Sequence, residues 1–127
     1  MELEKLHIAQ TDETPEVFLT VGAEMCFITG RSLPENAFDF YDPILKWIKT
    51  YVSQSNKPFL LQLRFEYFNS SSGRYLFELL NLLEQSKYKG NYRVICVTDK
   101  DDELMIDKGE ELRSLCDLKF EMVVSSH

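Results

Sequence analysis

The chain has 127 residues, and 14 Lys and Arg against 21 Asp and Glu give it a formal net charge of −7 at pH 7. Hydrophobic residues make up 44% of the chain, enough for the packed core of a single domain and too many for a disordered protein. A nucleic-acid-binding protein needs a basic stripe against the phosphates, and the scattered cations of this acidic chain argue against that class.

The sequence also argues against membrane insertion, secretion and metal chemistry. No window approaches the roughly 18–20 uncharged apolar residues of a membrane-spanning helix. The first residues, MELEKLHIAQTDE, are acidic where a signal peptide is basic, so we expect a cytoplasmic protein. Cys26, Cys96 and Cys116 are widely spaced and the chain has two histidines, so we expect no disulfide framework, no metal site and no cofactor.

The first third of the chain predicts strands. An edge strand is expected over Lys5–Gln10. Val17–Val21 and Glu24–Thr29 alternate in hydrophobicity on either side of Gly22-Ala23, which predicts a hairpin. We expect Gly30 to end its second strand.

A helix follows within Asn36–Ser53. Its apolar residues recur at helical spacing, namely Ile44, Ile48, Tyr51 and Val52, with Leu45 and Trp47 beside them. Pro43 could be the first helical residue with Asp42 as its N-cap, or it could lie inside a helix that begins near Ala37. We favour the earlier start.

The middle of the chain predicts a sheet that helices cover on one face only. Phe59–Phe68 reads as a strand with one apolar face, formed by Leu61, Leu63, Phe65 and Tyr67, and one mostly polar face. This alternation indicates that helices cover one side of the sheet only. A helix then runs from the junction after Asn69 to about Lys87, with Gly90 at its stop.

The remaining elements complete an alternating pattern. We expect strands at Tyr92–Thr98 and Phe120–Val124, separated by a helix over Asp102–Cys116 that Asp101 caps. The residues expected to face inward on that helix are Leu104, Leu112 and Leu115. The order β-β-β-α-β-α-β-α-β predicts a single α/β domain with a mixed sheet and helices packed mainly on one face.

No catalytic residue is predicted, but one acidic cluster has two interpretations. Asp99, Asp101, Asp102 and Glu103 follow the end of a strand, where clustered carboxylates could bind Mg²⁺ or accept a phosphoryl group. Acidic residues are equally favoured in the first turn of a helix, through capping and the helix dipole. We favour capping, and keep as the alternative a small Mg²⁺-dependent enzyme or phosphoacceptor that uses Asp99, Asp101 and Asp102.

The junction Asn69-Ser70-Ser71-Ser72-Gly73 is the strongest local signal, because three serines lie between a strand end and a helix start. Helix capping accounts for one hydroxyl and leaves two to be explained. A phosphate at this position would be stabilised by the free N–H groups of the first turn.

The order of strand, serine-rich junction and helix resembles the STAS domains of anti-sigma-factor antagonists, in which such a turn carries the phosphorylated hydroxyl. The chain resembles more closely the SiaC-type family of regulatory phosphoproteins. The likeness spans about residues 15–122 and is carried by three stretches: Ser32-Leu33-Pro34-Glu35-Asn36 before the Trp47 helix, Leu61 to Ser72, and Phe77 to Glu84.

The resemblance implies a non-enzymatic switch of STAS-like fold. A dedicated Ser/Thr protein kinase would phosphorylate Ser70, the residue after the junction asparagine, and a PP2C-type phosphatase would remove the group. The unphosphorylated form would bind and activate a diguanylate cyclase, raising cyclic di-GMP and favouring biofilm formation; an anti-sigma-type kinase is the alternative partner. Serine replaces the familiar threonine, and Gly73 brings the turn closer to that of the sigma antagonists, so Ser71 competes with Ser70 as the modified residue.

A partner surface follows from this resemblance. We expect the junction to be flat and polar, with the turn after Ser32 beside it. The residues expected to contact the partner are Pro34, Glu35, Asn36, Asn69, Ser70, Ser71 and Ser72.

Overall fold

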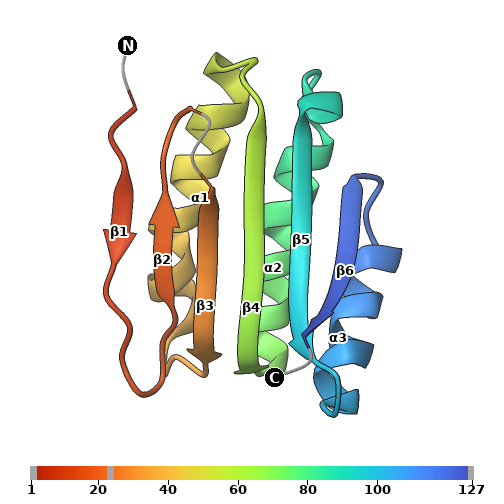
Figure 1. The fold of residues 1–127 in the computed structure, drawn as a ribbon. Helices are drawn as coiled ribbons and strands as arrows, with labels where there is room; N and C mark the ends of the chain where they lie inside the picture. The colour runs from red at the N-terminus through yellow and green to blue at the C-terminus, as the bar shows by residue number, and fades with distance from the viewer. Residues whose placement is uncertain (1–2, 23–24, 126–127) are drawn as a thin grey trace.

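A computed structural model describes residues 3–22 and 25–125. Its centre is a six-stranded sheet in the order β1-β2-β3-β4-β5-β6 (Figure 1). The strands are β1 (Leu6–Ile8), β2 (Glu16–Leu19), β3 (Cys26–Ser32), β4 (Phe59–Phe68), β5 (Tyr92–Asp99) and β6 (Lys119–Ser125). The helices are α1 (Ala37–Gln54), α2 (Ser70–Glu84) and α3 (Glu103–Ser114), with a short 3₁₀ helix η1 (Lys89–Asn91) before β5.

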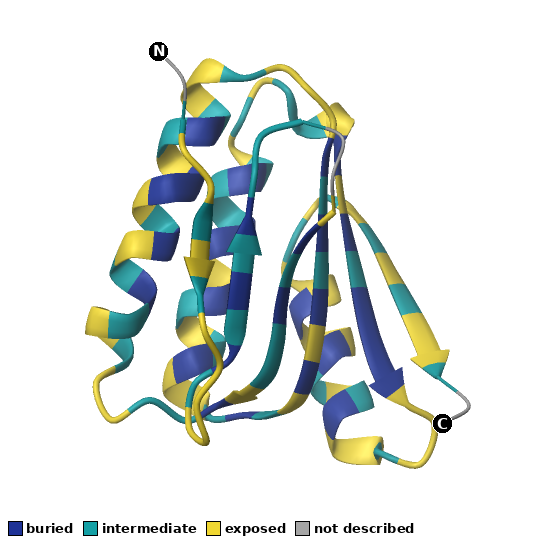
Figure 2. Ribbon diagram, turned by 60° about the vertical axis from the view of Figure 1, so that its left-hand side comes forward, coloured by how far each residue is buried: buried dark blue, intermediate teal, exposed yellow. Residues whose placement is uncertain are grey.

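The sheet is mixed, as expected. The pairs β1–β2 and β2–β3 are antiparallel, whereas β3–β4, β4–β5 and β5–β6 are parallel. Each parallel connection passes through a helix, and the helices lie on the same side of the sheet (Figures 1 and 2). This arrangement confirms the α/β prediction with one-sided helices. Within the described residues, no helix combines the length and apolarity needed to cross a bilayer.

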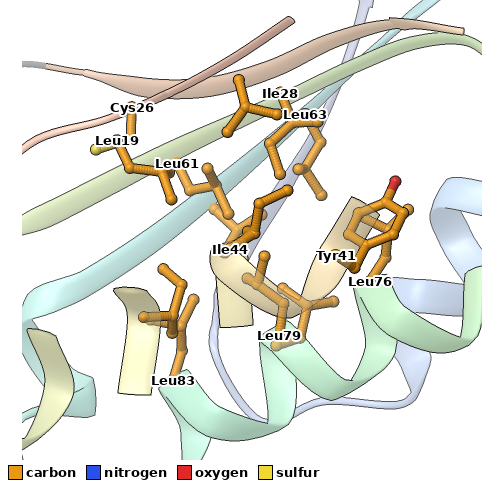
Figure 3. Close-up of a cluster of buried hydrophobic side chains, with 14 of the residues drawn as sticks. Leu19, Cys26, Ile28, Tyr41, Ile44, Leu61, Leu63, Leu76, Leu79 and Leu83 are labelled. Atoms are coloured by element: carbon orange, nitrogen blue, oxygen red, sulfur yellow. The ribbon is translucent and has the colours of Figure 1, made fainter. Parts of the chain in front are cut away.

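The core lies between the sheet and the helical layer. Leu61 and Leu63 of β4 point toward Ile44 of α1 and Leu79 of α2 (Figure 3), and these four side chains are buried. Burying each such side chain stabilises the fold by about 1.5–3 kcal/mol.

The helix α1 begins at Ala37, which confirms the favoured reading of its start. Asn36 is the N-cap, since its Oδ1 accepts a hydrogen bond from the Asp39 N–H at 3.1 Å. Pro43 lies inside the helix rather than at its first position. The capped first turn therefore forms ahead of the proline.

The hairpin strands differ from their predicted bounds. The first strand is β2, which starts one residue earlier and ends at Leu19. The predicted start of the second strand, Glu24, lies outside the described residues. Gly30 does not end this strand: β3 continues through it to Ser32, and Gly30 adopts a φ of 120°, a conformation that side chains with a Cβ rarely adopt.

A bulge in β4 corrects the predicted facing of its last residues. Gly30 pairs with Phe65, and the next residue, Arg31, pairs with Tyr67, so Glu66 is the extra residue of β4. An extra residue reverses the alternation of side chains beyond it. Phe68, at 5% exposure, is therefore the buried residue at the end of β4, and Tyr67 is half-buried.

The last two helices also differ from prediction. The helix α2 ends at Glu84, and Gly90 lies in η1 rather than at the helix stop. Asp102, not Asp101, caps α3, because its carboxylate accepts from the Met105 N–H at 3.1 Å.

The helix α3 packs on a face different from the predicted one. Gly109 faces the sheet, where an added Cβ would lie 2.7 Å from Met122 Cε and 3.0 Å from Cys96 Sγ. This close approach centres the buried face on Gly109. Leu112 is buried as predicted, but Leu104 and Leu115, which we expected to face inward, are 55% and 51% exposed.

Candidate functional site

The serine-rich junction is fixed by Asn69. This residue is the N-cap of α2, and its Oδ1 accepts a hydrogen bond from the Ser72 N–H at 2.9 Å. Its own N–H donates to the Ser32 carbonyl at 3.1 Å, which joins the start of α2 to the end of β3. The capping role that the sequence assigned to a serine is therefore filled by the asparagine.

The three serines have different environments. Ser72 is fully buried, and its hydroxyl donates to the Ser32 carbonyl at 3.0 Å and lies 2.8 Å from the Ser32 hydroxyl. This corrects its inclusion in the partner surface, because a residue with no exposed area cannot contact a partner. Ser70 and Ser71, the first two residues of α2, are exposed. In the described part of the chain, neither hydroxyl has a hydrogen-bond partner.

A buried polar chain continues from Ser72 into the core. The Ser32 hydroxyl lies 2.6 Å from the Tyr41 hydroxyl, which α1 supplies. Burial raises the pKa of Tyr41 from its usual 10.0 to about 12, although its hydrogen bonds with Ser32 and Ser72 oppose that rise. The Tyr41 ring also stacks on Tyr75 of α2, with centroids 5.7 Å apart. β3, α1 and α2 are thus held together directly beneath the junction.

The turn before α1 lies beside the junction. Ser32 pairs with Phe68 across the ends of β3 and β4, so the segments that follow these two residues leave the sheet at the same place. Glu35 and Asn36 are exposed and Pro34 is half-buried. Of the residues expected to form the partner surface, all except Ser72 keep exposed area at this end of the sheet.

Cations border the junction on the side of α3. The Lys108 Nζ donates to the Phe68 carbonyl at 2.9 Å. An open groove of about 310 Å³ runs between α2 and α3, and Ser70 lines it together with Arg74 and Lys108. One of the two exposed hydroxyls therefore opens onto a partly cationic groove.

The acidic cluster after β5 has structural roles. Asp102 caps α3, and the Asp99 carboxylate lies 4.0 Å from the Arg64 guanidinium across the exposed sheet face. Asp101 and Glu103 are exposed. Across residues 3–22 and 25–125, no group of three or more His, Cys, Asp or Glu side chains is placed to hold a metal ion. These placements support the capping interpretation.

Sequence reasoning missed four residues of this site: Ser32, Tyr41, Arg74 and Lys108. A polar residue at the end of an apolar strand, directly before a turn, was an available signal for Ser32. Arg74 follows Ser70 at helical spacing and could have been noted as its neighbour. Tyr41 lies three residues before Ile44 and seven before Ile48, so helical spacing was an available signal that it faces the core. Lys108 joins the site only through tertiary packing, for which the sequence offers no local signal.

Comparison with known proteins agrees with this geometry. The SiaC family model, described as that of a regulatory phosphoprotein, matches residues 8–125. An uncharacterised protein of Pseudomonas aeruginosa strain UCBPP-PA14 is 29% identical over 118 residues, which cover 91% of this chain and 92% of the relative.

Solved structures agree as well. SiaC of Pseudomonas aeruginosa superposes with a TM-score of 0.86 at 26% identity, over 96% of this chain and 99% of that one. A crystal structure of the diguanylate cyclase SiaD in complex with its activator SiaC, from the same organism, matches with a TM-score of 0.87 at 27% identity, over 94% of this chain and 99% of that one. The sequence match runs from the end of β1 through the junction to the end of β6, and the chain belongs to the SiaC family of regulatory phosphoproteins.

Proposed function

We propose that this protein is a non-enzymatic switch that binds and activates a diguanylate cyclase when unmodified and releases it when Ser70 is phosphorylated. A dedicated Ser/Thr protein kinase and a PP2C-type phosphatase would set the phosphorylation state in the cytoplasm. The cyclase is proposed as partner because a relative of the same fold forms a complex with one.

The observation that carries this proposal is the exposure of two hydroxyls that the fold does not use. Asn69 supplies the cap and Ser72 is buried against Ser32, so Ser70 and Ser71 are left at the surface. Hydroxyls without a structural role at a rigid helix start are well placed for a kinase. Phosphorylation would transfer the terminal phosphoryl group of ATP to the serine oxygen, with loss of the hydroxyl proton and departure of ADP.

The switch has a simple physical basis. The proposed docking surface consists of Pro34, Glu35, Asn36, Asn69, Ser70 and Ser71, whose exposed groups can hydrogen-bond to a partner. A phosphate adds about −1.5 to −2 charges at pH 7 and must be desolvated if a partner covers it. A cost of about 2–3 kcal/mol would weaken binding roughly 30- to 150-fold.

Calorimetric titration tests the proposal, with a purified diguanylate cyclase from the same genome and c-di-GMP synthesis as a second readout. The samples are the unmodified chain, Ser70→Ala, and protein with genetically encoded phosphoserine at position 70. We expect the first two to bind and activate the cyclase and the third to bind at least 30-fold more weakly.

Each part of the proposal can fail separately. Equal binding by the phosphorylated and unmodified proteins would contradict the switch. Phosphoserine at position 71 that releases the cyclase while phosphoserine at position 70 does not would move the site by one residue. Absence of binding by the unmodified chain would contradict the choice of partner.

A further inference from the structure

The groove between α2 and α3 brings two cations to the Ser70 end of α2. Residues of α2 form one wall and residues of α3 the other, and Phe68 lies at the junction end. The charged groups that line the groove are Arg74, Lys108 and Glu111. Two cations against one carboxylate give a local excess of positive charge in a protein of net charge −7.

Lys108 is anchored close to Ser70. Its ammonium group donates to the carbonyl of Phe68, which lies two residues before Ser70, and sits 4.8 Å from the centroid of the Phe68 ring. A second aromatic contact, 4.9 Å from the centroid of the Tyr67 ring, limits its movement. A lysine ammonium has three donors, so the bond to Phe68 leaves two available.

Arg74 approaches the same position from α2. It lies four residues after Ser70, a spacing that brings side chains on a helix within about 5–6 Å at their Cβ atoms. An anion that precedes a cation by four residues is the favourable order on a helix. Arg74 is exposed, and within the described residues its guanidinium has neither an ion pair nor a side-chain hydrogen bond.

We propose that a phosphate on Ser70 binds Arg74 and Lys108 together and so ties α2 to α3 across the groove. The inference rests on the proposed function, in which Ser70 is the modified residue. Guanidinium and ammonium groups form charge-assisted hydrogen bonds with phosphate oxygens, and Arg can do so in a bidentate manner. Glu111, on the α3 wall, opposes the binding by repulsion but leaves the cations in excess.

This arrangement separates the two candidate serines. Ser70 lines the groove, whereas Ser71 does not. A phosphate on Ser71 would project from the next position of the helix, about 100° around its axis. Lys108 would therefore bind a phosphate on Ser70 but not one on Ser71. This difference favours Ser70 as the regulated residue.

Phosphorus NMR titration of the intact chain tests the inference without any partner. Phosphoserine is encoded at position 70 in three backgrounds: unchanged, Lys108→Met and Arg74→Gln. The second ionisation of free phosphoserine has a pKa of about 6. Loss of either cation should lower the ratio of dianionic to monoanionic phosphate at pH 6 about threefold, the effect of an exposed ion pair. The positive end of the α2 dipole favours the dianion equally in all three proteins, so it does not change the ratio between them.

The matched control is phosphoserine at position 71, whose ionisation should be the same with and without Lys108→Met. If either Lys108→Met or Arg74→Gln leaves the titration of phosphoserine at position 70 unchanged, the inference is wrong, even where that phosphate still releases the cyclase. A different outcome separates the two proposals. If both variants change the titration of phosphoserine at position 70, but the phosphorylated chain binds the cyclase as tightly as the unmodified chain, the inference holds and the proposed function is wrong. Should Lys108→Met unfold, as thermal melting would reveal, Lys108→Gln takes its place, because its amide can still donate to the Phe68 carbonyl but carries no charge.

Discussion

The Ser72 hydroxyl donates to the carbonyl of Ser32 at 3.0 Å, although the two residues are 40 positions apart in the sequence. This bond joins the first turn of α2 to the last residue of β3 and lies in the interior. It orients the first turn so that the two preceding serines face outward. The exposed hydroxyls are thus positioned by a serine that a partner cannot reach.

Ser72→Ala should therefore destabilise the protein, whereas Ser71→Ala should not. The Ser32 carbonyl keeps its bond from the Asn69 N–H, but the variant loses two buried hydrogen bonds of the Ser72 hydroxyl, one to the Ser32 carbonyl and one with the Ser32 hydroxyl. The unfolding free energy should therefore fall by about 1–3 kcal/mol. Urea denaturation of both variants measures it. Because Ser71 is exposed at the same helix end, equal stability of the two variants would contradict the structural role assigned to Ser72.

Because Tyr41 is buried, we expect the protein to lose stability at high pH. Its pKa is about 12 in the folded protein and near 10.0 in the unfolded chain, so the folded state resists ionisation. The resulting stabilisation is complete below pH 10 and is lost as the pH rises toward 12. The unfolding free energy should fall by about 2–3 kcal/mol over that interval because of this residue.

Tyr41→Phe should remove this part of the pH dependence, as measured by urea denaturation at several pH values above 9. Burial also raises the pKa of Tyr51 and Cys116, and that of Cys96 from 9.0 to about 11, so the variant should keep a smaller slope of the same sign. A variant whose stability fell with pH as steeply as that of the unchanged protein would show that Tyr41 ionises freely.

Gly30 should not tolerate a side chain, whereas Gly90 should. Gly30 has a φ of 120°, and an added Cβ would lie 3.0 Å from the side-chain nitrogen Nε2 of Gln10. Gly30→Ala should cost about 1–3 kcal/mol, because an L side chain is strained in that conformation. Gly90 has ordinary φ and open space around it, so Gly90→Ala is the matched control and should be neutral or slightly stabilising. Equal thermal melting temperatures for the two variants would contradict the assigned strain.

The sequence predicted the order of the elements because hydrophobic periodicity is a local property. Strand β4 and helix α2 were recognised from spacing alone, and the junction between them was recognised as unusual. The bulge at Glu66 could not be predicted, since it depends on how β4 pairs with Gly30 of another strand. That one extra residue is why Phe68, rather than Tyr67, enters the core.

The site was predictable as a segment but not as an arrangement. The polar character of the serines was evident, yet the choice of which hydroxyl is buried depends on Ser32, which reaches Ser72 only in the folded protein. The packing face of α3 was missed for a similar reason. A glycine carries no hydrophobic signal, although Gly109 is the point where that helix approaches the sheet most closely. The likeness to STAS domains stays a prediction.

Variants of Asn69 test its role as the N-cap of α2 and the effect of charge beside Ser70. Asn69→Ala removes the acceptor for the Ser72 N–H and should lower the unfolding free energy by about 1 kcal/mol. Asn36→Ala, which removes the equivalent cap of α1, should cost a similar amount. Asn69→Asp keeps a capping oxygen and should stay within about 0.5 kcal/mol of the unchanged protein, because Asp and Asn are nearly equal as N-caps.

Asn69→Asp also places a fixed negative charge beside Ser70 while the fold stays intact. If charge at this position weakens docking, as the proposed switch requires, the variant should bind the cyclase more weakly than the unchanged chain but more tightly than the phosphorylated protein, since its charge is smaller. Calorimetric titration measures the difference, and urea denaturation confirms that the cap is kept. Binding as tight as that of the unchanged chain, in a variant of unchanged stability, would show that charge at the start of α2 does not control the partner.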